Sequence, residues 1–571
     1  MPLRSVVALG CADGTVATVA VGGRPEKAPE AQEADVARRE QMWGARLSRR
    51  DVLRSGAAAA GAYGAWRVFG SSGSGGNAGL RWTEGRQELR TPDSLPDPSR
   101  PAGTPDDVLP FDHVVVLMME NHSFDNLLGD LSRTRRDVVG QFSYDTGAPI
   151  YTNRDAKGNV VAPWHMTTTC QPGGVDQSWN VSHRSMFWSY GNSPETQYTE
   201  AYDPATFDYS APLSQVPLAP RTMQGFVIAN GGTPPMGYWT ADELPFTHSM
   251  AQAFTIANFW FCSTPCQTYP NRRFLYAATA FGDISTDNST IFDTSTVPPS
   301  IVGPPPNGTI FDRLSQYGIP WRNYFYDLPN TGIIPTTVQK YPTHIVPVEE
   351  FFADCAAGTL PAVSFVDPES GVPGVAGSAI ASLPVVQNLP GVQSANNFIQ
   401  TIDGDEESPA DMAYGEDFVA RVVNAVLASP AWERTLLIWT FDEHGGYADH
   451  IPPPAAIPPD RILPELAKGD FVGGYDLYGP RVPAVVVSAY AKPSSVSNVV
   501  YDHTSVLATI EAKWNLPACT YRDANAATVS DCLQTTAALL DPPVLPAPAP
   551  ALPGGLQCSS AVPSGVAPAA P

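Results

Sequence analysis

The chain has 571 residues, of which 43% are hydrophobic, and 57 acidic against 34 basic residues give it a net charge of -23. This length is ample for a large buried core. The acidic balance argues against a nucleic-acid partner, which is usually met by a basic face, and against binding to anionic lipid by bulk electrostatics alone.

Near the N-terminus, Arg49 and Arg50 precede a weakly hydrophobic, uncharged run at residues 55–66. This pattern is typical of a twin-arginine export signal, whose route carries folded proteins. An arbitrary arginine pair in a leader is the alternative. The run is shorter than the roughly 18 apolar residues that a spanning helix needs, and no later segment approaches that length. We therefore expect a leader over residues 1–70, no transmembrane helix in the mature protein, and a secreted or cell-envelope location.

Two further segments have compositions that do not form a core. Residues 71–110 are rich in Gly, Ser and Pro, which predicts a flexible linker. Residues 541–571 are rich in Pro and Ala, which predicts a disordered tail. The folded unit is then 111–540. If the protein is exported, Cys519 and Cys532 are candidates for a local disulfide, and two unpaired thiols are the alternative.

Continuous apolar runs alternate with amphipathic segments over the predicted folded unit. Such runs are typical of parallel strands covered on both faces, so the class is α/β with a mostly parallel sheet. The expected strands are 114–119, 254–262, 435–441 and 482–490, and the expected helices are 416–429 and a segment that begins at Asp502 or Thr504.

Polar side chains follow each of these strands, where sheets of this class bind their ligands. The residues in question are Glu120, Asn121, Thr268, Asn271, Arg272, Asp442, Glu443 and His503. Carboxylate and amide oxygens suit a divalent ion, which can activate a hydroxyl such as that of Thr268. Taken singly, each of these residues has an ordinary structural explanation in a turn or a helix cap.

Five motifs occur in order: DHVVVLMMENHSFDNLLG, TYPNRRF, FDEHGGYADHIPPP, YGPRVPAVVVSAYA and YDHTSVLATIEAKWNLPACTYRDA. Over residues 111–535 the chain thereby resembles the bacterial phosphoesterase family, which contains phosphatidylcholine-type phospholipases C and acid phosphatases. The resemblance implies a three-layer α/β/α sandwich similar to alkaline phosphatases.

The resemblance also implies the roles of the site residues. Glu120, Asn121, Asp442 and Glu443 are expected to bind one divalent metal ion, which can be Ca, Mg, Mn or Zn. Thr268 aligns with the nucleophile of the T-x-P-N-R motif, so a phosphothreonine intermediate is expected. The residues expected to bind phosphate are Asn271, Arg272, Gln177, His450 and His503.

The histidines depart from the family pattern. Gln177 stands where the family tends to have histidine in its D-x-H-S-W element, and Ser408 stands at the histidine of an H-P-x-x-D element. His183 and His344 are the remaining candidates for a catalytic histidine. For His450 and His503, a phosphate-binding role and a structural role are both open.

The resulting hypothesis is an exported phospholipase C-type phosphodiesterase that cleaves a phosphatidylcholine-like lipid to diacylglycerol and a phosphorylated head group. Its partners are a phospholipid or small phosphate ester and, transiently, a membrane surface. An acid phosphatase that uses the same site is one alternative. A catalytically impaired lipid- or surface-binding protein is another, because of Gln177 and Ser408.

Overall fold

The computed structural model describes residues 89–188, 190, 221–286, 304–369, 386, 388–392, 404, 406–551 and 558. The predicted leader with Arg49 and Arg50 lies outside these residues. Among the described helices, none is both long enough and apolar enough to cross a membrane.

An eight-stranded sheet forms the centre of the fold, in the order β12-β6-β11-β10-β1-β9-β7-β8. Every neighbouring pair is parallel except the two pairs that contain β11. The strands are β1 His113–Met119, β6 Thr255–Trp260, β7 Trp321–Phe325, β8 Ile345–Pro347, β9 Val363–Asp367, β10 Thr435–Phe441, β11 Ala484–Ser488 and β12 Ser495–Tyr501.

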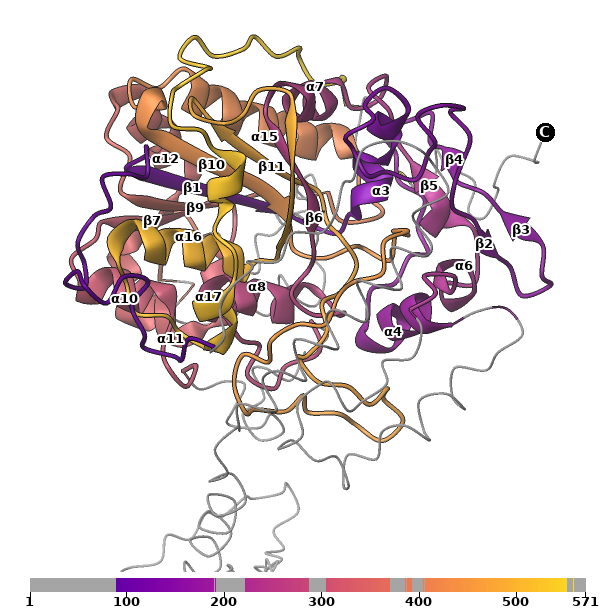
Figure 1. Ribbon diagram of the computed structural model, residues 1–571, viewed down its shortest axis with the longest axis horizontal. Coiled ribbons are helices and arrows are strands. Elements are labelled where there is room, and N and C mark those ends of the chain that lie inside the picture. Colours follow the sequence, from indigo (N-terminus) through magenta and orange to yellow (C-terminus); the bar gives the residue numbers. More distant parts are fainter. Residues whose placement is uncertain are drawn as a thin grey trace, which may run out of the picture.

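Helices cover both faces of this sheet (Figure 1). On one face lie α7 (Pro245–Ala253), α12 (Val348–Ala357) and α15 (Met412–Leu427). On the other lie α8 (Thr268–Ala277), α10 (Ile310–Gln316), α11 (Pro335–Lys340), α16 (Thr504–Trp514) and α17 (Tyr521–Asn525). The predicted three-layer sandwich with a mostly parallel sheet is confirmed.

The central strands form because their side chains can be buried on both faces of the sheet. All seven residues of β10 are buried, and so are six of the seven residues of β1. The helix predicted near Asp502 and Thr504 is α16, Thr504–Trp514, and the apolar stripe includes Val506, Leu507 and Ile510 as expected, although the residue at the N-cap is His503. These elements place the carboxyl ends of β1, β6 and β10 at one edge of the sheet.

One expectation about the sheet is wrong. The predicted strand 482–490 is β11, but it runs antiparallel to β10, with Ala484 opposite Thr440. Its carboxyl end therefore lies at the far edge. A strand that the sequence did not predict, β12, runs parallel to β6. It places His503 at the same edge of the sheet as the other polar residues. Apolar content cannot give strand direction, and β12 is an edge strand with a mostly half-buried pattern that weakens its sequence signal.

A smaller lobe, residues 120–188 and 221–240, lies beyond the carboxyl ends of the central strands (Figure 1). Its helices are α3 (Phe124–Leu127), α4 (Trp179–Phe187) and α6 (Phe226–Ala229). Its strands form two short pairs: β2 (Asn153–Arg154) with β3 (Val160–Val161), and β4 (Trp164–His165) with β5 (Gly237–Tyr238). Short 3₁₀ helices complete the described chain at Gly129–Arg133, Pro234–Met236, Asn330–Ile333, Pro342–His344, Trp432–Arg434 and Val529–Cys532.

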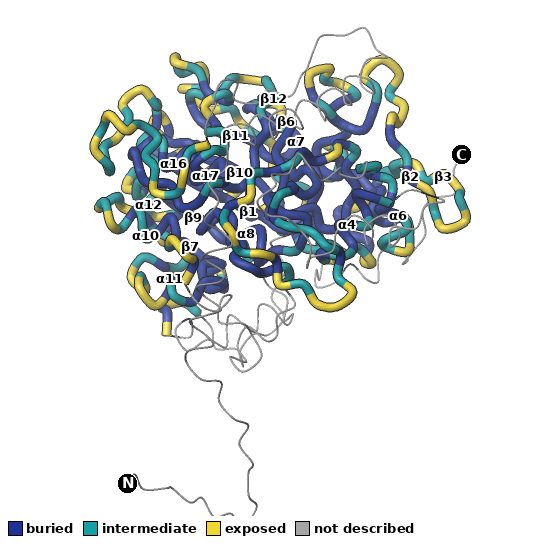
Figure 2. Tube along the Cα trace, turned by 60° about the horizontal axis from the view of Figure 1, so that its bottom comes forward, coloured by how far each residue is buried: buried dark blue, intermediate teal, exposed yellow. Residues whose placement is uncertain are grey.

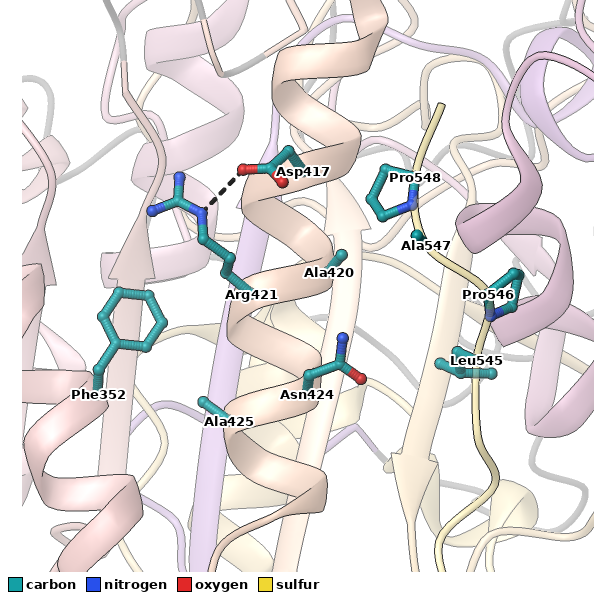
Figure 3. A pocket seen from close by; sticks show the side chains of 10 residues that line it. All are labelled: Phe352, Asp417, Ala420, Arg421, Asn424, Ala425, Leu545, Pro546, Ala547 and Pro548. Carbon is teal, nitrogen blue, oxygen red and sulfur yellow. Dashed lines mark hydrogen bonds and ion pairs between the residues drawn. The ribbon is translucent and has the colours of Figure 1, made fainter. Parts of the chain in front are cut away.

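Both predicted flexible ends are attached to the folded unit in part, so the expected boundaries need correction. Asn515 Nδ2 donates to the carbonyl oxygens of Asp97 and Arg100 at 3.0 and 2.8 Å, so this part of the predicted linker is held in place. At the other end, residues 545–548 run beside α15 and line one side of a groove on its outer face (Figure 3). Backbone carbonyl and N–H groups take part in these attachments, and amino-acid composition does not predict them.

The disulfide also differs from the expected candidate. Cys170 is bonded to Cys558, which ties the C-terminal tail to the lobe. Cys519 and Cys532 are buried free thiols. The sulfur of Cys519 lies among the carboxylates of Glu511 and Asp523, whereas that of Cys532 lies 3.8 Å from a tyrosine hydroxyl, so the two do not face each other.

Glu416 on α15 gives a test of the tail's attachment. Its Oε1 accepts from Thr247 N at 2.9 Å, and its Oε2 accepts from Ala549 N at 3.3 Å. Burial raises the pKa of Glu416 to about 7. A raised carboxyl pKa means that the folded state holds its proton more tightly than the unfolded state. This contribution to stability is therefore complete below about pH 4.5 and is lost as the pH rises to about 7.

We expect Glu416→Gln to remove this pH dependence, because the amide carries no charge at any pH, while its oxygen can still accept one of the two backbone hydrogen bonds. Relative to the wild type, the free energy of unfolding of the variant should rise by about 3 kcal/mol between pH 5 and pH 8. Thermal or urea unfolding of both proteins at the two pH values measures this. Asp417→Asn, an exposed change on the same helix, is the control. An equal difference at pH 5 and pH 8 would contradict the assignment.

Candidate active site

The floor of the candidate site is formed by the ends of two neighbouring strands. β1 and β10 pair in parallel with Met119 opposite Phe441, so Glu120 and Asp442 leave the sheet side by side. Asn121 N donates to Asp442 Oδ1 at 3.1 Å. The ends of β1 and β10 therefore lie together, as the sequence predicts.

Two tight backbone conformations bring the other predicted ligands to the same place. Asn121 has a φ of 72°, a left-handed conformation that asparagine tolerates better than most residues. Gly445 has a φ of 62° and packs so closely that an added Cβ would lie 1.8 Å from Asn121 O. Only glycine fits there. The close approach lets Glu443 Oε2 accept from Gly445 N at 2.7 Å while its other oxygen remains available.

Arg272 lies between two of the carboxylates. Its Nη2 donates to Glu120 Oε1 at 3.0 Å, and its Nε lies 3.3 Å from Asp442 Oδ2. The side chain is almost completely buried. Burial lowers the pKa of the guanidinium, but Glu120 and Asp442 outweigh this effect and raise it above its usual range. The expected contact of Arg272 with phosphate is therefore replaced in this structure by contacts with the predicted metal ligands.

Two oxygen atoms at the site are buried without a hydrogen-bond donor or ion pair, Asn121 Oδ1 and Glu443 Oε1, whereas Asp442 Oδ2 faces the Arg272 guanidinium. Burial, and then the charge of Asp442, raise the pKa of Glu443 well above its usual value. Burial also raises the pKa of Asp442, whereas Arg272 acts in the opposite direction. Uncompensated buried oxygens are costly, and a cation among them removes that cost.

The carboxylates do not close around one point. Among the described residues, the groups of acidic, Cys and His side chains whose ligand atoms lie within 4.8 Å of one another do not include the set Glu120, Asp442 and Glu443. Arg272 accounts for this, because it draws Glu120 and Asp442 to its own guanidinium. The donor set fits a divalent ion in its chemistry, with three anionic groups against one guanidinium.

Thr268 is the first residue of α8, beside Asp442. Its hydroxyl is near enough to Asp442 to lower the pKa of this carboxyl against the larger effect of burial. The N-terminus of a helix carries a partial positive charge, which favours an anion at this position. A buried hydroxyl beside an acceptor and a positive helix end is a suitable nucleophile.

Asn271 has a different role from the one expected. Its Oδ1 accepts from Thr264 N at 3.1 Å, and its Nδ2 donates to Thr264 O and Cys266 O at 3.1 and 2.8 Å. The side chain is completely buried, so it holds the loop that precedes Thr268 and has no group left for phosphate.

His503 also supports the site from behind. Its Nε2 donates to the backbone oxygen of Asp442 at 2.5 Å, and its Nδ1 accepts from Trp260 Nε1 at 3.4 Å. Burial lowers the pKa of His503 to about 4, so the ring is neutral. Both nitrogens are in use. The expectation of phosphate binding is corrected in favour of the structural role.

His450 belongs to a neighbouring polar cluster. Its Nδ1 donates to Asp125 Oδ2 at 2.6 Å, while Arg481 binds both oxygens of Asp449 at 2.9 Å and Asp125 Oδ1 at 3.2 Å. Sequence reasoning missed Asp125, Asp449 and Arg481, although all three lie within the quoted motifs. A phosphate contact by His450 stays a prediction.

His344 is not part of the site. Its ring stacks on Trp321 with the centroids 4.5 Å apart. Trp321 pairs with Val363, which pairs with Val114 at the start of β1. The six residues from there to Glu120 span about 20 Å, so His344 lies at the opposite edge of the sheet. His344 lies outside the five sequence motifs, so the sequence gave no indication of its place relative to the sheet.

His183 lies inside the lobe. It packs against the rings of Trp179 and Phe471, and its Nδ1 donates to Trp179 O at 2.6 Å. Burial lowers the pKa of His183 to about 4, which suits a general acid poorly at neutral pH. The described contacts assign it to the packing of α4.

Two segments that lack the family's histidines do reach the site. The backbone of Asp176, next to Gln177, packs against Gly446 of the loop that follows β10. The Ser408 side chain is hydrogen-bonded to Tyr447 in the same loop. Sequence reasoning missed Glu407, whose charge contributes to the raised pKa of Glu443. No motif marks this residue.

Comparison with known proteins gives a family match over residues 111–517, to the phosphoesterase family. The chain is similar to non-specific phospholipase C1 of Arabidopsis thaliana, with 26% identity over 442 residues that cover 73% of this chain and 70% of that protein. It is also similar to phospholipase C B of Mycobacterium tuberculosis (strain ATCC 25618 / H37Rv), with 28% identity over 473 residues that cover 74% and 77%.

Among solved structures, a protein in the alkaline phosphatase superfamily from Vibrio parahaemolyticus matches with a TM-score of 0.28 and 12% identity, covering 51% of this chain and 64% of that one. A likeness at this level carries no argument, so the fold rests on the sheet itself. Since the family match spans most of the chain and includes every strand of the central sheet, this protein belongs to the phosphoesterase family and is a phosphoric ester hydrolase.

Proposed function

We propose that this protein is an exported phospholipase C-type phosphodiesterase that uses Thr268 as its nucleophile and a divalent metal ion as its cofactor. The substrate class is supported by the similarity to proteins named as phospholipases C from a plant and a bacterium. The chemistry is supported above all by one observation, the position of the buried Thr268 at the N-terminus of a buried helix, where its hydroxyl lowers the pKa of the Asp442 carboxyl.

In the proposed reaction, Thr268 Oγ attacks phosphorus and the bond from phosphorus to the glycerol oxygen breaks. Asp442 is placed to accept the hydroxyl proton, and the diacylglycerol oxygen leaves with a proton from solvent or an acidic group. Water then cleaves the phosphothreonine and releases the phosphorylated head group. The positive end of α8 stabilises the negative charge that develops on Thr268 Oγ.

Glu120, Asn121, Asp442 and Glu443 would hold one divalent ion. When bound, this ion supplies Lewis-acid stabilisation to the phosphoryl oxygens and favours ionisation of the hydroxyl. The two buried oxygens without donors, Asn121 Oδ1 and Glu443 Oε1, support this assignment. Arg272 holds two of the four ligands, and His503 fixes the backbone of Asp442.

Export remains part of the proposal. The pattern around Arg49 and Arg50 supports it from the sequence. The bond between Cys170 and Cys558 is consistent with it, because disulfides persist mainly in oxidising compartments.

Thr268→Ala should reduce turnover by at least about 10³-fold, because the nucleophile is lost, and should leave thermal unfolding almost unchanged. Thr268→Ser retains a hydroxyl and should keep measurable activity. Hydrolysis and unfolding are measured on the same preparations. Near-normal turnover by the alanine variant would remove Thr268 as the nucleophile.

Glu443→Gln should weaken metal binding by at least about tenfold, because it removes an anionic ligand but keeps the hydrogen bond to Gly445. Isothermal titration with Mn²⁺ and Ca²⁺, and elemental analysis of the purified protein, give the affinity and the content. Glu416→Gln is the matched control, since it changes another fully buried glutamate that lies outside the proposed ligand set and outside the other groups of described side chains that could hold a metal ion. Equal metal affinity in the wild type and Glu443→Gln would exclude Glu443 as a ligand.

The substrate class is tested by comparing p-nitrophenyl phosphorylcholine with p-nitrophenyl phosphate under the same metal conditions. We expect a higher kcat/KM for the diester. A preference for the monoester would assign the site to an acid phosphatase. No turnover of either substrate with metal bound would favour the impaired-enzyme alternative and direct attention to Gln177 and Ser408.

A further inference from the structure

Exposed apolar side chains gather on one part of the lobe. The described residues contain ten exposed large apolar or tyrosine side chains, and four of them lie between residues 144 and 190. They are Tyr144, Ile150, Val160 and Tyr190, with exposed fractions of 45%, 61%, 57% and 51%. We call these four residues the apolar tip. Contiguous exposed apolar surface often marks an interaction site, so the arrangement of the segments that carry these four residues matters.

Two consecutive hairpins and one contact bring the apolar tip together. In the first hairpin, Phe142 is bridged to Pro149 and Ile150 N donates to Gln141 O at 2.9 Å, which places Tyr144 in the turn. Residues 151–152 lead directly into the second hairpin, β2–β3, which carries Val160.

Tyr190 completes the tip from a later part of the chain. An added Cβ at Gly158, in the β2–β3 turn, would lie 2.6 Å from the Tyr190 ring. The absence of a side chain at Gly158 therefore leaves room for this ring. Figure 2 shows the β2–β3 turn as an exposed projection at the edge of the molecule.

The β2–β3 hairpin, which carries Val160 of the apolar tip, lies on the side of the sheet where the candidate active site is located (Figure 1). The central strands end toward the lobe, and β2 and β3 lie at its outer limit in both views (Figures 1 and 2). Contacts connect the lobe to the loop that follows β10: Ser182 Oγ lies 2.9 Å from His444 Nε2, and the rings of Tyr151 and His450 are 6.2 Å apart. Tyr151 directly follows the first hairpin.

We propose that the apolar tip docks this protein on a phospholipid bilayer by inserting into its interfacial region. This inference rests on the proposed function, because a phospholipase must reach lipids that are packed in a surface. The residue types fit this partner: Ile150 and Val160 supply apolar groups, and Tyr144 and Tyr190 have the apolar body and polar end that suit the headgroup level.

Charge determines which bilayer is expected. The net charge of -23 opposes attraction to anionic lipid, so docking must depend on apolar insertion. Cations in the second hairpin can still meet lipid phosphates, because Arg154 and Lys157 are exposed there, whereas Arg136 beside Tyr144 is paired with Asp145. The occupant is therefore a zwitterionic phosphatidylcholine surface.

Co-sedimentation with phosphatidylcholine vesicles tests the proposal in the full chain. A Thr268→Ala background prevents the vesicles from being consumed. We expect Ile150→Ser combined with Val160→Thr to weaken vesicle binding by at least about tenfold, since several methylene groups are lost from the inserted surface. Val108→Thr combined with Val544→Thr is the matched control, because these valines are 85% and 99% exposed elsewhere and should leave binding unchanged.

A second measurement separates docking from catalysis. In the otherwise wild-type enzyme, the tip variant should keep its turnover of soluble p-nitrophenyl phosphorylcholine and lose most hydrolysis of phosphatidylcholine vesicles. Unchanged vesicle binding by the tip variant, or an equal loss in the control variant, would overturn the proposal. A change of oligomeric state in size-exclusion chromatography without a loss of vesicle binding would also overturn it, and would assign the tip to a self-interface. If no substrate is hydrolysed, the proposed function fails and vesicle binding still decides the docking role.

Discussion

The parallel, in-register pairing of β1 and β10 is the constraint on which the site depends. This pairing sets Met119 opposite Phe441 and so brings Glu120 and Asp442 out of the sheet as neighbours. A shift of one residue would exchange the two faces of a strand that is buried on both sides, and would separate the polar pair. Gly445 then closes the arrangement, because its missing side chain allows the loop after β10 to pack on Asn121.

Such close placement leaves the protein with several buried charges. Arg272 compensates part of this charge through its contacts with Glu120 and Asp442. Removing one partner of a buried ion pair typically costs about 3–5 kcal/mol, so Arg272 stabilises the site as well as shaping it. Glu443 is left with one oxygen that has no donor and with a pKa raised mainly by burial. Such an oxygen is costly to bury, and this cost supports the proposal that the site binds a divalent cation.

Much of the central fold could be predicted from the sequence, because β1 and β10 are continuous apolar runs of strand length and α16 has an apolar stripe of helical period. The direction of β11 could not be predicted, since a short apolar run gives the same sequence signal in a parallel and in an antiparallel strand. The sequence also could not predict which groups the side chains contact. Asn271 and Arg272 lie in the quoted motif, but only the structure shows that one holds a loop and the other holds carboxylates. His344 was misplaced because a single histidine carries no information about the edge of the sheet at which it lies.

The arrangement separates two physical requirements of a surface-active hydrolase. The proposed chemistry needs fixed, desolvated groups, and these lie at the ends of central strands and at the start of α8, where packing allows little movement. Docking to a bilayer needs apolar groups that remain exposed, which would be destabilising inside the sheet layers. The lobe meets this second requirement by carrying short hairpins on a framework that contacts the loop after β10. Because the hairpins contribute none of the proposed metal ligands, the exposed residues can change to suit a different surface without altering the site that cleaves the ester.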